Sequence, residues 1–565
     1  MDRDTLYNIL LSNFGFSPTK DQARVLYHLA AFILTEKERP LYLLRGYAGT
    51  GKTTLISTLV KTLPQIGTGF QLLAPTGRAA KVMSRYTGKT ALTLHKKLYR
   101  FQATANGELR MTRDENKSIN TIFIVDECSM ISDQGDGFSW SRSLLDDLIE
   151  YVFSGSRCKL LLIGDAAQLP PVGLDISPAM DFDLLRSSFN LTTATYEMKE
   201  VMRQAFDSGI LYNATKIRNL MSPSYQVTES PSLYQSQYNL PLLDINNFSD
   251  IEKIDPMSFE ELLWQSFGDK RSNNDAVVVC RSNKRANMFN QAIRSRVLQE
   301  EGELSAGEKL MIVKNNYYWI NESLSHQVTK SPRQEVETRQ LHHKNEHSVI
   351  DTSKTTNSQI LRFSDSQVLR FSDSQILRFS DSQVLRFSDS QVLRFSGSQI
   401  LIPFLANGDM VEVMRINKIE EMYGFHFADV DIMLLDYADT PTLSVKILLE
   451  TLHSEAPALT EEESKRLYQS VEEDYMDIPR ATDRRKAMKE NPYYNALQVK
   501  YGYALTCHKT QGGQWNNVFV EAPYLPEGNA LEVGDLRWLY TALTRASEKV
   551  YLVNFKDEWF NLMEN

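Results

Sequence analysis

Residues 41–60, LYLLRGYAGTGKTTLISTLV, constrain the fold more than any other stretch of this chain. An apolar run at 41–44 leads into a loop of the pattern Gly-x4-Gly-Lys-Thr, and a helical stretch follows. Such a loop wraps phosphate groups with its backbone N–H groups, and it joins a buried strand to a helix. The stretch therefore predicts an α/β fold with a nucleotide site at the carboxyl edge of its sheet.

The loop supplies most of the candidate nucleotide contacts. Lys52 is expected to reach the β and γ phosphates of ATP, and the Thr53 hydroxyl is expected to bind Mg²⁺. The other loop candidates are Gly46, Gly49, Thr50, Gly51 and Thr54. Upstream, SPTKDQARVLYHLAAF predicts a capped helix with Gln22 in its first turn. Gln22 is either a reader of an adenine edge or part of the plain helix surface.

Polar side chains follow two further apolar strands. TIFIVDECSM places Asp126 and Glu127 directly after the run at 122–125. Asp126 is expected to hold Mg²⁺ through water, and Glu127 to polarise the attacking water. KLLLIGDAAQLPPVG ends in a turn that carries Gln168. Gln168 either senses the γ-phosphate and the attacking water or caps its own loop.

Basic, hydroxyl and aromatic residues follow another strand, in a pattern typical of nucleic-acid contacts. LLAPTGRAAKVM at 72–83 places Thr76 and Arg78 near a helix start, where they suit a backbone phosphate. TLHKKLYRF at 93–101 interleaves basic and aromatic residues, which suits single strands whose bases stack. Its candidates are His95, Lys96, Tyr99 and Phe101. The alternative for this stretch is an amphipathic helix that runs into a strand.

Asn106-Gly107 is a hairpin-turn signal, and it predicts a β-hairpin over about 98–119. Beside a nucleic-acid groove, such a hairpin would act as a wedge. The net charge of −9 does not point to nucleic acid, but binding depends on local basic surface rather than on the sum. Four scattered cysteines without a Cys-x-x-Cys pair fit a reducing cytosol. We expect a cytoplasmic protein without a signal peptide or membrane span, and nucleoid-associated if prokaryotic.

Together these motifs resemble those of the superfamily 1 DNA helicases, specifically the RecD/Dda-like branch, over most of the chain outside about 320–402. GYAGTGKTT is similar to motif I, APTGRAAK and TLHK to motifs Ia and Ib, DE to motif II, and GDAAQLPPV to motif III. YEMKEVMRQ is similar to motif IV, YALTCHKTQGGQW to motif V and LYTALTRASEKVYLV to motif VI.

The resemblance implies an ATP-dependent DNA helicase that acts on single-stranded DNA and its junctions with duplex DNA. The Gln-Leu-Pro-Pro of motif III implies 5′→3′ movement. The resemblance also implies other replication or repair proteins as partners. Two alternatives stay open: a DNA-stimulated translocase that displaces proteins without processive unwinding, and a partner-binding scaffold with a vestigial ATPase.

The resemblance also implies roles for residues in the second half of the chain. Arg203 would be a γ-phosphate arginine, and Arg545 would be the arginine finger that completes the ATP site across a cleft. For Arg545 alone, a surface salt bridge is the alternative. Gly512 would lie at the nucleotide–DNA junction. Thr506, His508 and Lys509 would contact DNA, although ordinary strand-to-helix loop chemistry also accounts for them.

The implied fold is α/β, with two RecA-like P-loop motor domains and a small SH3-like β-barrel. Domain 1A would span 1–200, with its hairpin, and domain 2A would span 201–304 and 495–565. The barrel domain, 2B, would span 305–320 and 403–494 and carry a charged helical projection at 460–490.

The remaining residues, 321–402, hold an octapeptide repeat, S-Q-[VI]-L-R-F-S-D. Copies begin at Ser358, Ser366, Ser374, Ser382 and Ser390, and a decayed copy begins at Ser398. On a strand, an even repeat keeps its faces, but neither face is cleanly apolar. The consensus unit carries one Asp and one Arg, so it is not an obvious DNA tether. We expect a mobile, dispensable insertion; a partner-binding or self-associating segment is the alternative.

Overall fold

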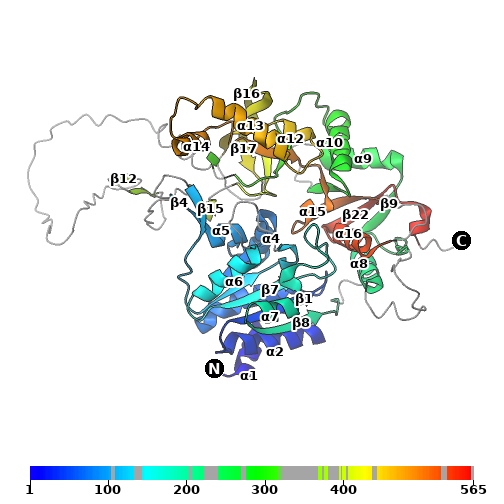
Figure 1. Ribbon diagram of the computed structural model, residues 1–565. Helices are drawn as coiled ribbons and strands as arrows, with labels where there is room; N and C mark the ends of the chain where they lie inside the picture. The colour runs from blue at the N-terminus through cyan, green and yellow to red at the C-terminus, as the bar shows by residue number, and fades with distance from the viewer. Residues whose placement is uncertain are drawn as a thin grey trace, which may run out of the picture.

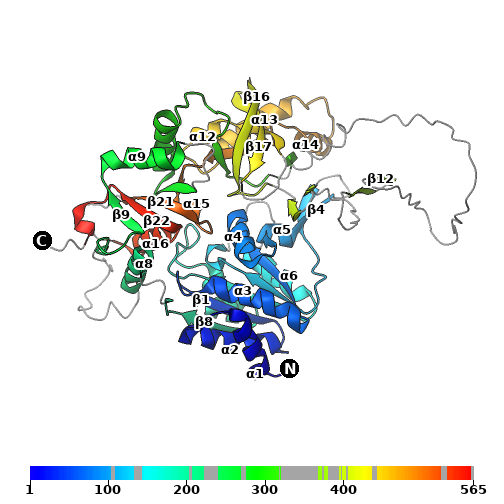
Figure 2. The same cartoon turned by 180° about the vertical axis from the view of Figure 1, so that it is seen from behind.

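The structure is a computed structural model of the 565-residue chain. It describes residues 1–103, 109–132, 143–202, 207–221, 240–268, 275–316, 318–319, 367–371, 374–378, 393–395, 398–402, 405–435, 442–523 and 531–560. Figures 1 and 2 show these parts from opposite sides.

A six-stranded parallel sheet forms the first body, in the order β3-β2-β6-β7-β1-β8. Its strands are β1 (Pro40–Gly46), β2 (Gly69–Ala74), β3 (Ala91–Thr93), β6 (Thr121–Val125), β7 (Lys159–Gly164) and β8 (Thr192–Met198). The apolar runs that the sequence marks as strands lie within β1, β6 and β7. The predicted parallel α/β sheet is therefore confirmed.

Helices cover both faces of this sheet with two apolar clusters. One face packs on α1 (Arg3–Phe14), α2 (Lys20–Leu34), α3 (Lys52–Thr62) and α4 (Gly77–Thr87). The other packs on α5 (Leu94–Leu98), α6 (Leu144–Ser154) and α7 (Phe182–Ser188). Lys159 begins β7 and donates to the carbonyls of Phe32 and Ile33 at 3.2 and 2.7 Å, so it caps the end of α2.

A second parallel sheet, β20-β10-β21-β22-β9, stands beside the first (Figure 1). Its strands are β9 (Ile251–Ile254), β10 (Ala276–Cys280), β20 (Ala504–Thr506), β21 (Trp515–Glu521) and β22 (Ala546–Val553). The helices packed on it include α8 (Gly209–Leu220), α9 (Pro256–Phe267), α10 (Asn283–Ala292), continued by a π-helix (Ile293–Val297), and α16 (Val533–Leu543). The short α15 (Cys507–Thr510) follows β20.

A closed five-stranded barrel forms the third body, as expected for the insertion between the two halves of the second sheet. It consists of β11 (Lys309–Ile312), β16 (Met410–Met422), β17 (Phe425–Leu434), β18 (Leu443–Leu448) and β19 (Leu497–Tyr501). The barrel extends past the boundary expected at 494, because β19 pairs with both β11 and β18 and closes the ring. A buried ion pair between Arg294 and Glu308 ties the barrel entrance to the π-helix.

Short helices pack against one end of the barrel, where the sequence predicts a helical projection. They are α12 (Glu450–His453), α13 (Glu461–Glu473) and α14 (Ala481–Lys489). Leu467 and Val471 of α13 and Met488 of α14 bury their side chains against Phe425 and Phe427 of β17. A capping box between Thr460 and Glu463 starts α13, which explains why this charged stretch is helical.

A β-hairpin interrupts the first body where Asn106-Gly107 predicts a turn. It pairs β4 (Tyr99–Ala103) with β5 (Leu109–Arg113), from Tyr99 opposite Arg113 to Ala103 opposite Leu109. The turn itself lies outside the described residues. Across the described part of the chain, no helix combines the length and the apolar character that crossing a membrane requires.

The repeat insertion leaves the barrel and returns to it at one point. The N–H groups of Asn316 and Leu405 each donate to the other's carbonyl at 2.8 Å, so the two ends of the excursion are held together. Described parts of the repeat pair as two antiparallel hairpins. These are β12 (Gln367–Phe371) with β13 (Ser374–Arg378), and β14 (Leu393–Phe395) with β15 (Ser398–Ile402).

Deleting residues 325–402 should leave the barrel folded, because Asn316 and Leu405 still pair and closing a long surface loop contributes little free energy. We expect the thermal midpoint of unfolding to stay within about 2 °C of wild type, measured by circular dichroism. A deletion of 325–406 is the matched control. It also removes the buried Leu405 and should lower the midpoint clearly. A large fall in the thermal midpoint of the 325–402 deletion would show that the repeat contributes to the stability of the barrel.

Candidate nucleotide and nucleic-acid site

The phosphate loop joins the end of β1 to the start of α3, as predicted. Gly49 and Gly51 have φ of 74° and 91°, a left-handed backbone that only glycine adopts without strain. A Cβ at Gly46 would lie 3.0 Å from Thr50 Oγ1 and 3.2 Å from Lys52 Cγ. The loop is thus a tight backbone cradle that fits a phosphate chain.

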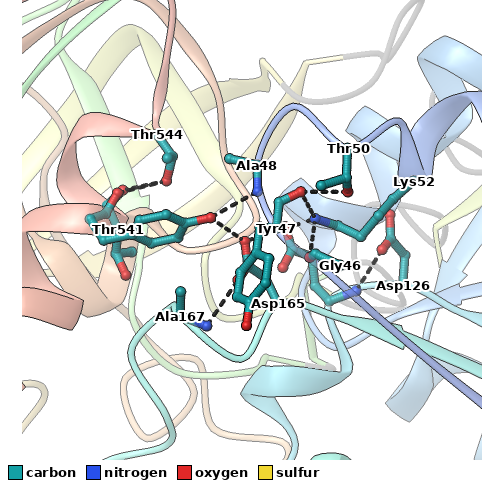
Figure 3. Close-up of polar contacts among 12 residues, drawn as sticks. Gly46, Tyr47, Ala48, Thr50, Lys52, Asp126, Asp165, Ala167, Thr541 and Thr544 are labelled. Atoms are coloured by element: carbon teal, nitrogen blue, oxygen red, sulfur yellow. Dashed lines mark hydrogen bonds and ion pairs between the residues drawn. The ribbon is translucent and has the colours of Figure 1, made fainter. Parts of the chain in front are cut away.

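Lys52 is folded back onto this cradle. Its Nζ donates to the carbonyls of Gly46 and Tyr47 at 2.7 and 3.0 Å (Figure 3), and it lies 3.8 Å from Asp165 Oδ2. Carbonyl and carboxylate oxygens therefore satisfy the ammonium group, and a phosphate oxygen could replace them.

Gln22 is only 2% exposed, so its interpretation as plain helix surface is wrong. Its side chain completes a capping box with Thr19, and its Nε2 donates to the carbonyl of Thr50 at 3.0 Å. The amide thereby joins the start of α2 to the phosphate loop. Its predicted contact with adenine stays a prediction.

Two buried acids stand at the end of β6. Asp126 accepts from the Tyr86 hydroxyl and from the Glu127 N–H, both at 2.9 Å. Burial raises the pKa of Asp126, and the nearby Lys52 opposes that rise. Burial and then Asp126 raise the pKa of Glu127, while Arg545 and Lys52 lower it. Two buried acids with too little positive charge around them form a favourable binding site for a divalent cation.

Glu127 adds a second sign that this acidic end is built for a ligand. Its Oε2 is buried and has no hydrogen-bond partner among the described residues, and its backbone is left-handed at φ 53°. A buried unpartnered carboxylate oxygen is costly unless water or a ligand satisfies it. Asp126 and Thr53, at the start of α3, are the residues that would hold Mg²⁺ here.

Gln168 and Asp165 follow β7, which lies between β1 and β6 in the first sheet. Gln168 is 6% exposed, and its Oε1 has no partner among the described residues. The loop cap that the sequence leaves open for Gln168 comes instead from Asp165, whose Oδ1 accepts from the Ala167 N–H at 2.9 Å. The free amide oxygen of Gln168 is available to a ligand or water.

The second sheet brings α16 and Arg545 close to these loops. Arg545 is 4% exposed, and its guanidinium donates to the carbonyls of Thr541 and Gly513 at 3.1 and 3.2 Å. The alternative of a surface salt bridge is therefore wrong. Tyr540, also on α16, donates its hydroxyl to Asp165 Oδ2 at 2.8 Å. Arg203 lies outside the described residues.

The loop after α15 packs closely on α4. Gly512 has φ of 71°, and a Cβ there would lie 2.7 Å from Ala79 Cβ. The next residue, Gly513, leaves room for Arg78, whose guanidinium lies 3.6 Å from the ring centroid of Trp515. The sequence predicts a phosphate contact for Arg78, but this residue is 9% exposed and its guanidinium stacks on an indole. This arginine joins the two sheets.

The other predicted nucleic-acid residues lie on α4, α5 and α15 or on the residues next to them, and these helices lie on the barrel side of the two sheets in both views (Figures 1 and 2). The Thr76 hydroxyl caps α4 by accepting from Ala79 N–H at 3.2 Å. Thr506 precedes α15, and His508 and Lys509 lie on it. Loss of contact with water lowers the pKa of His508, and it lowers that of Lys509 to about 8.

The α5 candidates are partly engaged within the protein. Burial lowers the pKa of Lys96 to about 8, while Asp409 of the barrel opposes that fall. His95 lies 5.8 Å from Tyr99, between ring centroids. The Tyr99 hydroxyl donates to Asp147 Oδ2 at 2.7 Å, so its ring is fixed against α6 rather than presented for stacking. The side chain of Phe101 lies outside the described residues.

Comparisons with known proteins agree with this geometry. Residues 19–223 match the AAA domain family, and residues 501–553 match the UvrD-like helicase C-terminal domain family. The chain is 30% identical over 208 residues to the ATP-dependent RecD2 DNA helicase of Deinococcus radiodurans, covering 37% of this chain and 25% of that protein. It is 26% identical over 276 residues to the ATP-dependent DNA helicase dda of Enterobacteria phage T4, covering 48% and 55%.

In these stretches the chain is similar to ATP-dependent DNA helicases. The chain spans about a quarter and about half the length of these two relatives. It is also similar to the Pif1 helicase from Candida albicans, at 14% identity, 97% coverage of both chains and a TM-score of 0.38.

Four residues of this site are not singled out by the sequence motifs. Tyr86 bonds Asp126, Trp515 holds Arg78, and Tyr540 bonds Asp165. Asp165 and Tyr540 do stand inside the motif III and motif VI stretches. Their pairing across two sheets, 375 positions apart, leaves no local pattern to find.

Replacing Gly512 with alanine should loosen the junction of α4 with the second sheet. The alanine would have to adopt a left-handed backbone, and its Cβ would collide with Ala79. We expect faster hydrogen exchange in α4 and a lower thermal midpoint, by a few °C. Gly534→Ala is the matched control. Nothing lies within 4 Å of its Cβ, so it should match or slightly exceed wild-type stability. Equal behaviour of the two variants would contradict the close packing.

Proposed function

We propose that the protein is an ATP-dependent DNA helicase that moves 5′→3′ on single-stranded DNA. One observation carries the proposal. The phosphate loop and the acids of the first sheet meet the second sheet: Tyr540 of α16 bonds Ala48 and Asp165, and Arg545 lowers the pKa of Glu127. An ATP site divided in this way lets binding and hydrolysis change the relation between two bodies, which is what a motor on a strand requires.

In the proposed reaction, the loop backbone and Lys52 bind the phosphates of ATP. Bound Mg²⁺, held by Thr53 and Asp126, would neutralise charge that develops on the phosphates. Glu127 would orient and polarise the attacking water, and Gln168 would contact that water or the γ-phosphate. Arg545 would stabilise the transferred group from the opposite sheet, and Arg203 would add a second positive charge.

Gln22 would contact adenine next to its bond with the loop at Thr50. Gly512 would link this site to the nucleic-acid side, because it packs against α4. Gly46, Gly49, Gly51 and Thr54 would complete the nucleotide contacts.

Single-stranded DNA would run between the barrel and the ends of α4, α5 and α15. Lys96 and Lys509 have pKa values lowered to about 8, so their ammonium groups lie where contact with water is reduced. A phosphate oxygen would restore the favourable interaction that burial removes. Thr76, His95, Thr506 and His508 lie on these helices or directly before them. Tyr99 and Arg78 would support this surface rather than contact the strand.

The 5′→3′ direction rests on the likeness of Gln168-Leu169-Pro170-Pro171 to motif III of the RecD/Dda-like branch. The β4–β5 hairpin is a candidate wedge at a duplex junction, since it projects from the first body beside α5 (Figure 1). We assign 1–200 to domain 1A, 201–304 with 502–565 to domain 2A, and the barrel with its helices to domain 2B. The protein would act in the cytoplasm, on the nucleoid in a prokaryote, with replication or repair proteins as further partners.

Duplexes with one single-stranded tail test the proposal. Tails of equal length, on the 5′ or the 3′ side, are incubated with Mg-ATP, and strand separation is followed by fluorescence. We expect separation from 5′ tails only. Lys52→Ala should lower ATP turnover by about 10²–10³-fold, whereas Lys61→Ala, an exposed lysine on the same helix, should retain it.

Each other outcome contradicts part of the proposal. Separation from 3′ tails only would refute the direction. Turnover stimulated by single strands, without strand separation, would favour the protein-displacing translocase. Turnover that single strands do not stimulate would refute both motor functions and favour the scaffold.

A further inference from the structure

The Tyr540 hydroxyl touches two parts of the nucleotide site at once. It donates to Asp165 Oδ2 at 2.8 Å and accepts from the Ala48 N–H of the phosphate loop, also at 2.8 Å. Tyr540 itself belongs to α16 of the second sheet and is 1% exposed. One buried hydroxyl thus connects the loop after β1 and the loop after β7 to the opposite body.

This hydroxyl keeps its proton. Burial, and then the charge of Asp165, raise the pKa of Tyr540 well above its ordinary value. The phenol therefore remains a donor to Asp165 and an acceptor from Ala48 across the working pH range. A donor to a carboxylate makes a charge-assisted bond, which is stronger than a neutral one.

Asp165 carries the contact on to Lys52. Its Oδ2 lies 3.8 Å from Lys52 Nζ, and its Oδ1 accepts from Ala167 N–H at 2.9 Å. When Lys52 turns toward a phosphate, Asp165 loses its nearby ammonium group. The Tyr540 hydroxyl and the Ala167 N–H then remain as donors to Asp165, so the carboxylate depends more strongly on its bond to Tyr540. Figure 3 shows Lys52, Asp165 and Ala48 around this point.

The helix that bears Tyr540 also sets the position of Arg545. Thr541 Oγ1 accepts from the Leu169 N–H at 3.0 Å, which fixes α16 to the loop after β7. The Thr541 carbonyl accepts from Arg545 Nε at 3.1 Å. Two consecutive residues of α16, Tyr540 and Thr541, therefore contact loops of the first sheet, and Thr541 also bonds Arg545.

We propose that Tyr540 is a positioning residue that couples the position of Lys52, through Asp165, to α16 and Arg545. It acts through its hydroxyl and makes no contact with ATP. The inference rests on the proposed ATPase function. It predicts that removal of the hydroxyl lowers turnover but not nucleotide binding. Lys52 and the loop would still bind phosphate, while Arg545 would no longer be held in position.

Tyr540→Phe tests this coupling. We expect the affinity for a non-hydrolysable ATP analogue to change by no more than about threefold, and turnover with single-stranded DNA to fall by about 10- to 100-fold. The ratio of DNA-stimulated to basal turnover should fall toward one. Tyr501→Phe is the matched control. It removes a buried hydroxyl that donates to the Glu303 carbonyl, away from the cleft, and it should keep the wild-type ratio.

Hydrogen exchange without nucleotide tests the contact independently of activity. The amides of Ala48 and Leu169 both donate to α16 side chains, so both should exchange faster in Tyr540→Phe than in wild type. If wild type hydrolyses no ATP, the proposed function fails, yet the exchange result still decides whether the contact exists.

Two results would overturn the proposal. One is a wild-type stimulation ratio in Tyr540→Phe. The other is unchanged exchange at Ala48. Should Tyr540→Phe fail to fold, Asp165→Asn removes the charged acceptor and keeps the shape. It should give the same split between binding and turnover, and equal losses in both would contradict the coupling.

Discussion

A buried carboxylate, Asp165, is the point on which the two sheets depend for their mutual position. It is 1% exposed and lies within reach of three kinds of donor: the Ala167 N–H, the Tyr540 hydroxyl and the Lys52 ammonium group. A buried charge persists only when such partners surround it. The phosphate loop, the loop after β7 and α16 must therefore stay together for this group to be tolerated. A ligand that draws Lys52 away leaves Asp165 with fewer groups that stabilise its buried charge.

The sequence predicts the first sheet and its loop well, because each part is encoded locally. A phosphate loop needs a buried strand, left-handed glycines and a helix start within about a dozen residues. The parallel strands before Asp126 and Gln168 are continuous apolar runs, and both place their polar ends in the cleft. The barrel boundary at Tyr501 is harder to predict, because β19 pairs with β11, which lies almost two hundred residues earlier.

Side-chain partners across the cleft could not be read from the sequence. Arg78 has the residue type and position of a phosphate ligand, but Trp515 of the other sheet lies beneath its guanidinium. Tyr99 has the type of a stacking residue, and Asp147 holds its hydroxyl. The repeat, the most conspicuous feature of the sequence, bears little on the site. The bridge between Asn316 and Leu405 holds the two ends of the insertion together, outside the strands that close the barrel.

The central claim is that an ATP site on the first sheet is completed by the second. Binding and turnover of Mg-ATP, measured side by side in Arg545→Lys, test it most directly. Lysine keeps the charge and loses the planar fork that bonds Thr541 and Gly513. We expect Arg545→Lys to bind Mg-ATP within about threefold of the wild-type affinity and to turn it over about 10²–10³-fold more slowly. Turnover equal to that of wild type would contradict the claim.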